Sequence, residues 1–264
     1  MKVNKFILLI ASIFVLAGCT SSQPDRFSGR IIDLTHTYDK NAIFWPTAKE
    51  FELENVFADF TDNGYYYTAN NFCMAEHGGT HIDAPIHFFK DRNTLDAIPL
   101  DQLIGQGAVI DVTAKCADNP DYLVSVSDFT AWEETHGRRL DDVIVLMNTG
   151  FHKFWPDRIK YMGTAERGPE AVPKLHFPGL DPQAAKWLVE NRQIKAIGLD
   201  TPSIDYGQSK LFESHVTLYE HNIPAFENVA TLSQLPAKDF TVIALPMKIK
   251  GGSGGPLRIV AIVP

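Results

Sequence analysis

The chain has 264 residues, of which 45% are hydrophobic and 21% are charged, a composition typical of a globular protein. Its formal net charge is −8, and it contains no cluster of lysine and arginine. Because phosphate binding needs a concentrated basic face, nucleic acid is not expected as a partner. The sequence shows no internal repeat, so we expect one domain after a short leader.

Residues 1–18 have the pattern of an export signal. Lys2 and Lys5 form a basic start, and an apolar run follows over residues 6–17. This run is shorter than the roughly 20 residues that a helix needs to cross a bilayer. We therefore predict a cleaved signal peptide, with an uncleaved membrane anchor or a buried helix as the alternatives.

Residues 16–19, Leu-Ala-Gly-Cys, match a lipobox and predict cleavage after Gly18 with lipidation of Cys19. Acyl chains on that cysteine would attach the protein to a membrane, at roughly 0.8 kcal/mol for each buried methylene group. Residues 19–30 then form a short tether. Because Thr20 is not the aspartate that retains lipoproteins in the inner membrane, we expect an exported bacterial lipoprotein that faces the periplasm or cell surface. In a Gram-negative cell the outer membrane is its expected location.

Residues 31–264 are predicted to form the folded domain, which opens with a short apolar strand at residues 31–34. Apart from Cys19, the chain holds Cys73 and Cys116, which are candidates for a disulfide if their Cα atoms come close. Cys73 stands four residues before a histidine, so it is also a candidate thiolate ligand. A small buried core residue is the favoured interpretation.

Residues 77–87 read His-Gly-Gly-Thr-His-Ile-Asp-Ala-Pro-Ile-His and hold four metal-binding side chains. Neutral imidazole and carboxylate suit Zn²⁺, Mn²⁺ or Fe²⁺, and short spacing lowers the loop-closure entropy of gathering them around one ion. We predict His77, His81 and Asp83 as ligands. The alternative is a set of ordinary loop histidines in which the aspartate caps a helix.

Two glycines, Gly78 and Gly79, separate the first two histidines and argue against a helical zinc site. Each glycine would cost a helix about 1 kcal/mol, and Pro85 would interrupt it soon afterwards. We expect the histidines on a strand end and the tight loop that follows it. Glycine allows positive φ there and a close approach of the backbone to an ion.

Apolar runs at residues 108–112 and 143–147 have the length of buried strands. Between them, residues 127–136 are predicted to form a helix with Ser127 as its N-cap and Gly137 at its end. This order is typical of a β-α-β unit.

The same rhythm continues in the second half of the chain. A helix is predicted over residues 182–192 with Asp181 as its cap, and a strand over 194–199. Residues 154–180 interrupt this alternation of strands and helices, because they contain many prolines and glycines. We predict a long ordered loop there, which either closes over a pocket or lies on the surface. Runs at 243–249 and 257–263 predict a C-terminal hairpin around a glycine-rich loop that lacks the signature of a phosphate-binding loop.

Polar residues follow the predicted strand at 194–199, where α/β sheets commonly build their sites. The stretch 200–205 contains two aspartates, and His215 and Glu227 come after it. The spacing of these last two residues has little specificity by itself, and a core histidine and a solvated carboxylate are the plain alternatives.

The motif at 77–87 has the form His-x-Gly-Thr-His-x-Asp-x-Pro-x-His, and together with residues 198–205 and 244–252 it resembles the metal-dependent cyclase family. That family includes bacterial kynurenine formamidase and isatin hydrolase, and the likeness runs from about Ile31 to the C-terminus. The resemblance implies an α+β fold in a swivelling β/β/α arrangement, with a mixed β-sheet or small barrel and outer helices. It also implies a homodimer or tetramer.

The resemblance implies roles for individual residues. In the kynurenine formamidase branch the residues matching His77, His81 and Asp83 hold one metal ion, and the aspartate bridges to a second ion that residues matching His215 and Glu227 complete. The isatin hydrolase branch uses one ion, usually manganese. The presence of both later residues favours two ions here, zinc or manganese.

Two further residues gain roles from the same resemblance. His87 matches the family's catalytic histidine, and its chemistry agrees, since an imidazole outside a three-ligand shell can move protons near neutral pH. Trp45 matches a Trp-Pro pair that lines the substrate pocket, although Thr47 and Ala48 stand where the family has Gly-Asp. A tryptophan that fills the core is the alternative for Trp45.

The predicted function is hydrolysis of a C–N bond in a small aryl formamide or cyclic amide, such as N-formylkynurenine or isatin. Metal-activated water would attack the carbonyl carbon while His87 shuttles the proton. Two alternatives are a lactone or ester hydrolase of the same fold and a non-catalytic metal-binding periplasmic lipoprotein. The second alternative would have no need of His87.

Overall fold

The computed structural model describes residues 29–264, and the predicted signal peptide and Cys19 lie outside the described residues. Its strands are Arg30–Asp33 (β1), Glu52–Phe60 (β2), Tyr66–Cys73 (β3), His81–Asp83 (β4), Ile104–Asp111 (β5), Leu123–Val124 (β6), Val143–Asn148 (β7), Gly179–Leu180 (β8), Ala196–Leu199 (β9), Ala225–Glu227 (β10), Thr241–Pro246 (β11) and Gly254–Val263 (β12). Its α-helices are Leu100–Leu103 (α1), Thr113–Asp118 (α2), Val126–His136 (α3), Arg158–Met162 (α4), Pro182–Asn191 (α5) and Glu213–Glu220 (α6). Short 3-10 helices are Pro85–His87 (η1), Leu95–Ala97 (η2), Phe151–Phe154 (η3), Pro169–Lys174 (η4) and Leu232–Gln234 (η5).

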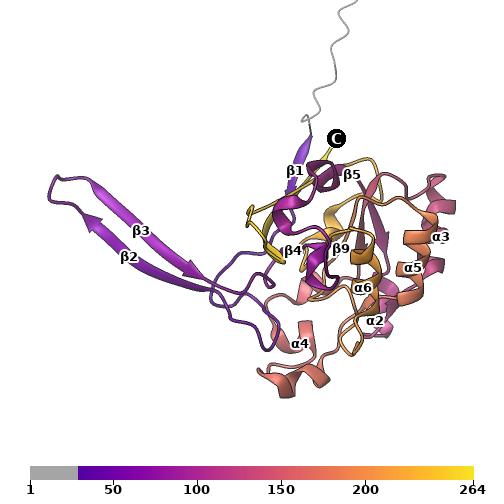
Figure 1. Ribbon diagram of the computed structural model, residues 1–264, viewed down its shortest axis with the longest axis horizontal. Coiled ribbons are helices and arrows are strands. Elements are labelled where there is room, and N and C mark those ends of the chain that lie inside the picture. Colours follow the sequence, from indigo (N-terminus) through magenta and orange to yellow (C-terminus); the bar gives the residue numbers. More distant parts are fainter. Residues whose placement is uncertain (1–28) are drawn as a thin grey trace, which may run out of the picture.

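The body of the protein is a mixed β-barrel with helices on its outside (Figure 1). Eight strands lie in the order β1-β12-β11-β5-β7-β9-β10-β4. An additional pairing of β4 with β12 closes the seven strands from β12 to β4 into a barrel, and β1 pairs with β12 beside it. Strands β5, β7, β9 and β10 run parallel, and antiparallel pairings complete the ring. The predicted α+β fold with a small barrel is confirmed.

Strand β7 shows how the sequence builds this core. All six of its residues are buried, which explains its continuous apolar run. Because side chains alternate along a strand, Val143, Val145 and Met147 pack with the outer helices, while Ile144 and Leu146 join the apolar cluster on the sheet's other face. Burial of each such side chain stabilises the fold by about 1.5–3 kcal/mol.

The predicted helices are present with small differences at their ends. Helix α5 begins at Pro182, and the Asp181 side chain accepts a hydrogen bond from the Gln183 N–H at 2.7 Å, as predicted. The predicted cap of α3 is wrong by two residues. Ser125 is the N-cap because its N–H donates to Asp128, which forms a capping box with it.

Residues 154–180 contain α4, η4 and β8 and support the loop that carries Trp45. Arg158 donates to the carbonyl oxygen of Phe44, and Arg167 donates to the carbonyl oxygen of Trp45 at 3.2 Å. Residues 154–180 therefore fix the backbone of Phe44 and Trp45 through hydrogen bonds.

Strands β2 and β3 form a two-stranded arm that projects from the barrel (Figure 1). Cys73 ends the arm and is exposed, so the interpretation as a buried core residue is wrong. Cys116 is buried, and both thiols are free, so the candidate disulfide does not form. Within residues 29–264, no helix is both long and apolar enough to cross a membrane.

Candidate active site

Pairing between β4 and β10 places three candidate ligands on one face. His81 and Asp83 are two residues apart on β4, so their side chains point to the same side. Glu227 on β10 lies directly opposite His81 in the antiparallel register. The His81 Nε2 atom is 3.2 Å from Asp83 Oδ1 and 3.4 Å from Glu227 Oε2, and all three side chains are buried.

His77 reaches the same point from a tight loop that precedes β4. We expected the histidines on a strand end and in the loop after that strand. The structure has the opposite order, because His77 lies in a loop that leads into β4, and β4 begins at His81. Gly79 has φ +59°, and a Cβ on Gly78 would lie 2.0 Å from the ring of Phe44, so both positions require glycine. The turned loop brings His77 Nδ1 to 2.7 Å from Asp83 Oδ1.

A second contact fixes the other nitrogen of His77. Its Nε2 lies 2.9 Å from the hydroxyl of Ser253, which donates to Glu76 at 2.6 Å. Gly254 follows on β12, and a Cβ there would come within 2.5 Å of His77 Cε1. The glycine-rich hairpin loop thus serves the site by allowing a close approach to His77.

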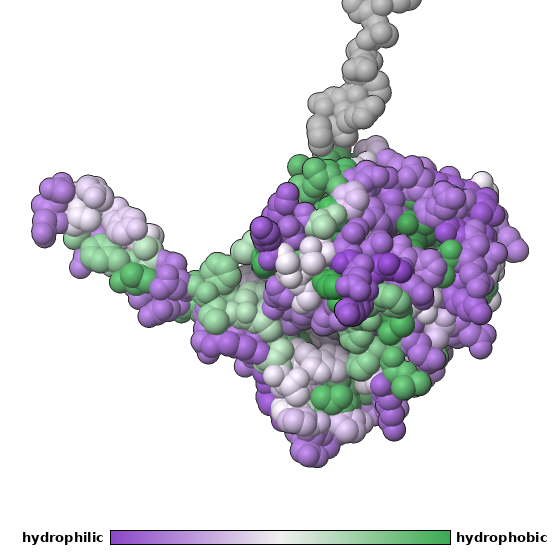
Figure 2. Space-filling model, in the orientation of Figure 1, coloured by the Kyte–Doolittle hydropathy of each residue, from purple (hydrophilic) through white to green (hydrophobic). Residues whose placement is uncertain are grey.

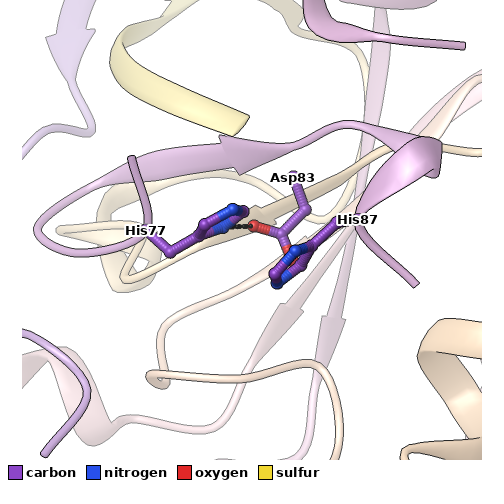
Figure 3. A group of neighbouring side chains, drawn as sticks. All are labelled: His77, Asp83 and His87. Atoms are coloured by element: carbon purple, nitrogen blue, oxygen red, sulfur yellow. Dashed lines mark hydrogen bonds and ion pairs between the residues drawn. The ribbon is translucent and has the colours of Figure 1, made fainter. Parts of the chain in front are cut away.

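His87 closes the site from η1. Its ring stacks on that of His77 at 3.7 Å between centroids and 15° between planes. Figure 3 shows both imidazoles next to the Asp83 carboxylate. Burial lowers the pKa of His87 to about 4, and the attraction of Asp83 opposes this only partly. His87 is therefore neutral at pH 7 and able to accept a proton.

Helix α6 supplies His215 and a tyrosine one turn later. The Asp205 carboxylate accepts hydrogen bonds from the backbone N–H of Ser214 and His215, and it lies 2.5 Å from His215 Nδ1. His215 Nε2 then lies 3.2 Å from Glu227 Oε1. Tyr219, at i+4 on the same helix face, donates to Asp83 Oδ2 at 2.8 Å.

The electrostatics of this cluster favour a cation. Burial raises the pKa of Asp83, but His77 and His215 outweigh that effect and hold the pKa well below its usual range. Burial and the neighbouring charge of Asp83 raise the pKa of Glu227. For His215, burial lowers the pKa, but hydrogen bonds to Asp205, Asp83 and Glu227 raise it well above its usual value. His215 is thus drawn toward the charged form because buried carboxylates surround it.

The donor set fits a divalent metal ion. Two groups have ligand atoms within 4.8 Å of one another: His77 with Asp83 and His87, and His81 with Asp83 and Glu227. The His81 Nε2 atom is buried and has no hydrogen-bond partner, as expected of a nitrogen that binds an ion. Among residues 29–264, the side chains that line the cavity include no lysine or arginine to neutralise the carboxylates. Asp83 belongs to both groups.

These side chains form the floor of a cavity of about 300 Å³. The six histidine, aspartate and glutamate residues predicted from sequence all line it, and Trp45 contributes to its wall. Phe44, Phe88 and Phe212 add further aromatic surface. A small, largely apolar cavity with convergent polar groups at one end is typical of a site for a small molecule.

The sequence interpretation missed three residues that position the ligands. Tyr219 carries a signal, because it stands four residues after His215 on a helix. Asp205 lay within the polar stretch singled out after β9, but no role was assigned to it. Ser253 could not be found, because its contact with His77 spans 176 residues of sequence. Cys73, considered as a further ligand, is not among the residues that line the cavity.

Comparisons with known proteins agree with this site. The model of the Cyclase family matches residues 32–206. Isatin hydrolase of Roseibium aggregatum is 31% identical over 84% of this chain and 84% of its own length. Kynurenine formamidase of Bacillus cereus is 29% identical over 87% of this chain and 95% of its own length.

The same relationship is seen in a solved structure. A crystal structure of an isatin hydrolase bound to the product analogue thioisatinate superposes with a TM-score of 0.78. It is 29% identical to this chain, with 89% of this chain and 92% of that chain covered. The resemblance drawn from the motif is confirmed, and the chain belongs to the Cyclase family.

Proposed function

We propose that this enzyme hydrolyses the C–N bond of a small aryl formamide or cyclic amide, with isatin and N-formylkynurenine as representative substrates. The proposal assigns one or two ions, zinc or manganese, to His77, His81, Asp83, His215 and Glu227. The observation that carries it is the cluster of histidine and carboxylate donors that lines a small aromatic cavity. Both named relatives act on compounds of this kind.

A bound divalent ion supplies Lewis acidity, which polarises a carbonyl group and makes water acidic near neutral pH. The chain's own residues would transfer the proton and position the ligands. His87 is neutral at pH 7 because burial depresses its pKa, so it can take the proton of the attacking water and pass it to the departing nitrogen. Tyr219 and Ser253 hold Asp83 and His77 in place through their hydroxyl groups.

The wall of the cavity supports an aryl substrate. Trp45 packs edge-on against Phe177 at 6.5 Å, so its ring is held by the core while it faces the cavity. A volume of about 300 Å³ lies at the lower end of ligand pockets and suits one aromatic ring system. The apolar surface would exclude water from the reacting group and strengthen the polar contacts at the floor.

A substrate panel tests the proposal. The metal-depleted protein would be reconstituted with Zn²⁺ or Mn²⁺ and incubated with isatin, N-formylkynurenine, and matched aryl lactones and esters. We expect turnover of at least one amide and little turnover of the lactones and esters. Turnover of lactones or esters alone would indicate a lactone or ester hydrolase of the same fold. Turnover of none of these compounds would contradict the proposed activity.

The N-terminus adds a proposal on location. We propose that Cys19 is lipidated and anchors the enzyme to a bacterial membrane on the periplasmic or outer side. The sequence Leu-Ala-Gly-Cys at residues 16–19 supports this. Intact mass of the mature protein from the membrane fraction tests it, because an acylated N-terminal cysteine gives a defined added mass that Cys19→Ser would abolish.

A further inference from the structure

The turn that follows β9 is buried and tightly held. Thr201 Oγ1 donates to the carbonyl oxygens of Pro178 and Ser203, both at 3.1 Å. The backbone N–H of Ile204 donates to Glu227 Oε1 at 2.8 Å. Thr201 and Ile204 are fully buried, and Ser203 is 5% exposed. The turn thus holds Ser203 in a fixed place at the carboxyl end of a parallel strand, where sheets of this kind commonly bind their ligands.

The hydroxyl group of Ser203 is not used by the protein itself. Ser203 lines the cavity of the candidate active site. Its carbonyl oxygen accepts the hydrogen bond from Thr201, but its Oγ makes no hydrogen bond with any residue of the described chain. Buried hydroxyl groups are nearly always hydrogen-bonded, because leaving water without a partner is unfavourable. The Ser203 hydroxyl is therefore available to a molecule in the cavity.

The other polar side chains of the cavity are less able to donate to a ligand. Asn228 Nδ2 donates to the Gly79 carbonyl oxygen at 2.7 Å, and its Oδ1 accepts from Tyr161 at 2.8 Å. The carboxylates only accept, and the imidazoles belong to the proposed metal site and proton shuttle. The indole N–H of Trp45 is also unpaired within residues 29–264, but Trp45 is partly exposed and water can reach it. Ser203 is thus the buried lining side chain that can give a hydrogen bond to an uncharged oxygen atom.

The surroundings of Ser203 limit which molecule that can be. On the face of the molecule in Figure 2, hydrophilic residues cover most of the barrel body, whereas Phe44, Trp45, Phe88 and Phe212 form aromatic walls of the cavity. An oxygen atom of a ligand that leaves water for such surroundings needs a donor to replace the water. An aromatic ring that carries a carbonyl oxygen fits both the walls and the free hydroxyl group.

We propose that the Ser203 hydroxyl donates a hydrogen bond to a ketone oxygen that the substrate carries on its ring, next to the amide nitrogen. This inference rests on the proposed function, because both representative substrates have a ketone at that position, isatin within its five-membered ring and N-formylkynurenine in its side chain. The residue after Ser203 contacts Glu227, so Ser203 lies at the edge of the donor cluster. The attacked carbonyl group and the ketone can then belong to one small molecule. Ser203 is thereby a substrate-binding residue that selects anilides with an ortho ketone.

Two small amines of the product type test this contact without turnover. 2′-Aminoacetophenone carries a ketone beside its nitrogen, and 2-ethylaniline has a methylene group in place of that carbonyl group. Their dissociation constants would be measured by isothermal titration calorimetry on the Zn²⁺-loaded parent protein and on Ser203→Ala. We expect the parent protein to bind the ketone more tightly than 2-ethylaniline. Ser203→Ala should weaken ketone binding roughly fivefold, the effect of one neutral hydrogen bond, and change 2-ethylaniline binding by less than about twofold.

Ser233→Ala is the control, because the Ser233 hydroxyl contacts His152 Nε2 at 3.1 Å and does not line the cavity. It should bind both amines as the parent protein does, and circular dichroism checks that each variant is folded. Trp45→Phe tests the other unpaired donor, since it keeps an aromatic ring and removes the N–H. Equal affinity of the parent protein for the two amines, or equal weakening of both by Ser203→Ala, would overturn the proposal. So would a loss of ketone binding in Trp45→Phe in place of Ser203→Ala.

The calorimetry also separates this inference from the proposed function. Turnover of isatin or N-formylkynurenine, combined with unchanged ketone binding in Ser203→Ala, would keep the reaction and reject the role of Ser203. A selective loss of ketone binding in Ser203→Ala, in a protein that turns over neither amide, would keep the role of Ser203 in ligand binding and reject the reaction.

Discussion

Asp83→Asn should remove more metal than any other single substitution in the site, because Asp83 belongs to both donor groups. Its Oδ1 contacts His77 and its Oδ2 accepts from Tyr219, at 2.7 and 2.8 Å. An amide keeps the volume but directs an NH₂ group at one of these donors and removes the negative charge. Loss of one charge-assisted hydrogen bond costs about 1.5–3 kcal/mol. At the upper end this corresponds to about a 100-fold weaker affinity for metal.

The assay is metal content per chain by elemental analysis after dialysis against a fixed concentration of Zn²⁺ or Mn²⁺. Asp128→Asn is a suitable control, because Asp128 is also buried and accepts several hydrogen bonds, including those of the α3 capping box. The control should lower stability and leave metal content unchanged. Full metal occupancy in Asp83→Asn would refute the bridging role and the reasoning behind it.

Three further predictions follow from the same structure. His87→Ala should keep its metal while turnover falls by roughly 10²–10⁴-fold if His87 is the proton shuttle, and metal loss in elemental analysis would instead make it a ligand. Gly254→Ala should lose metal although residue 254 is no ligand, because its Cβ would lie 2.5 Å from His77 Cε1; unchanged metal content would contradict this. Burial and the nearby His152 lower the pKa of His36 from 6.5 to about 4, so the unfolded state takes up a proton first and stability is lost as pH falls from 6.5 to 4. That loss of folding stability amounts to about 3 kcal/mol. His36→Phe can retain the ring stack on Trp155, so acid unfolding followed by circular dichroism should show a smaller loss of stability in this variant. An acid transition identical to that of the parent protein would contradict the role of His36.

Local signals account for the parts of the fold that could be predicted. Strand β7 is apolar along its whole length, and α5 carries a capping aspartate and a first-turn proline. The ligand motif was also readable, because its residues lie close in sequence and its glycines exclude a helix. Each of these features depends on interactions within about a dozen residues.

Long-range pairing explains what could not be predicted. The barrel closes where β4 pairs with β12, and the sequence between them holds no signal for that register. The contact of Ser253 with His77 depends on this closure, so it could not be predicted from the sequence either. The arm was missed because both faces of β2 and β3 are exposed, and no single buried face produces the alternating pattern that marks a strand.

The most direct test of the account is turnover of isatin and N-formylkynurenine measured against metal bound per chain. Metal-depleted protein would be titrated with Zn²⁺ or Mn²⁺, and the product identified by mass. We expect no turnover without metal and a rise in proportion to bound metal. The product should be heavier than isatin by one water, or lighter than N-formylkynurenine by CO, because hydrogen replaces the formyl group, which leaves as formate. Turnover that persists in the metal-depleted protein, or full metal binding without turnover of either amide, would contradict it.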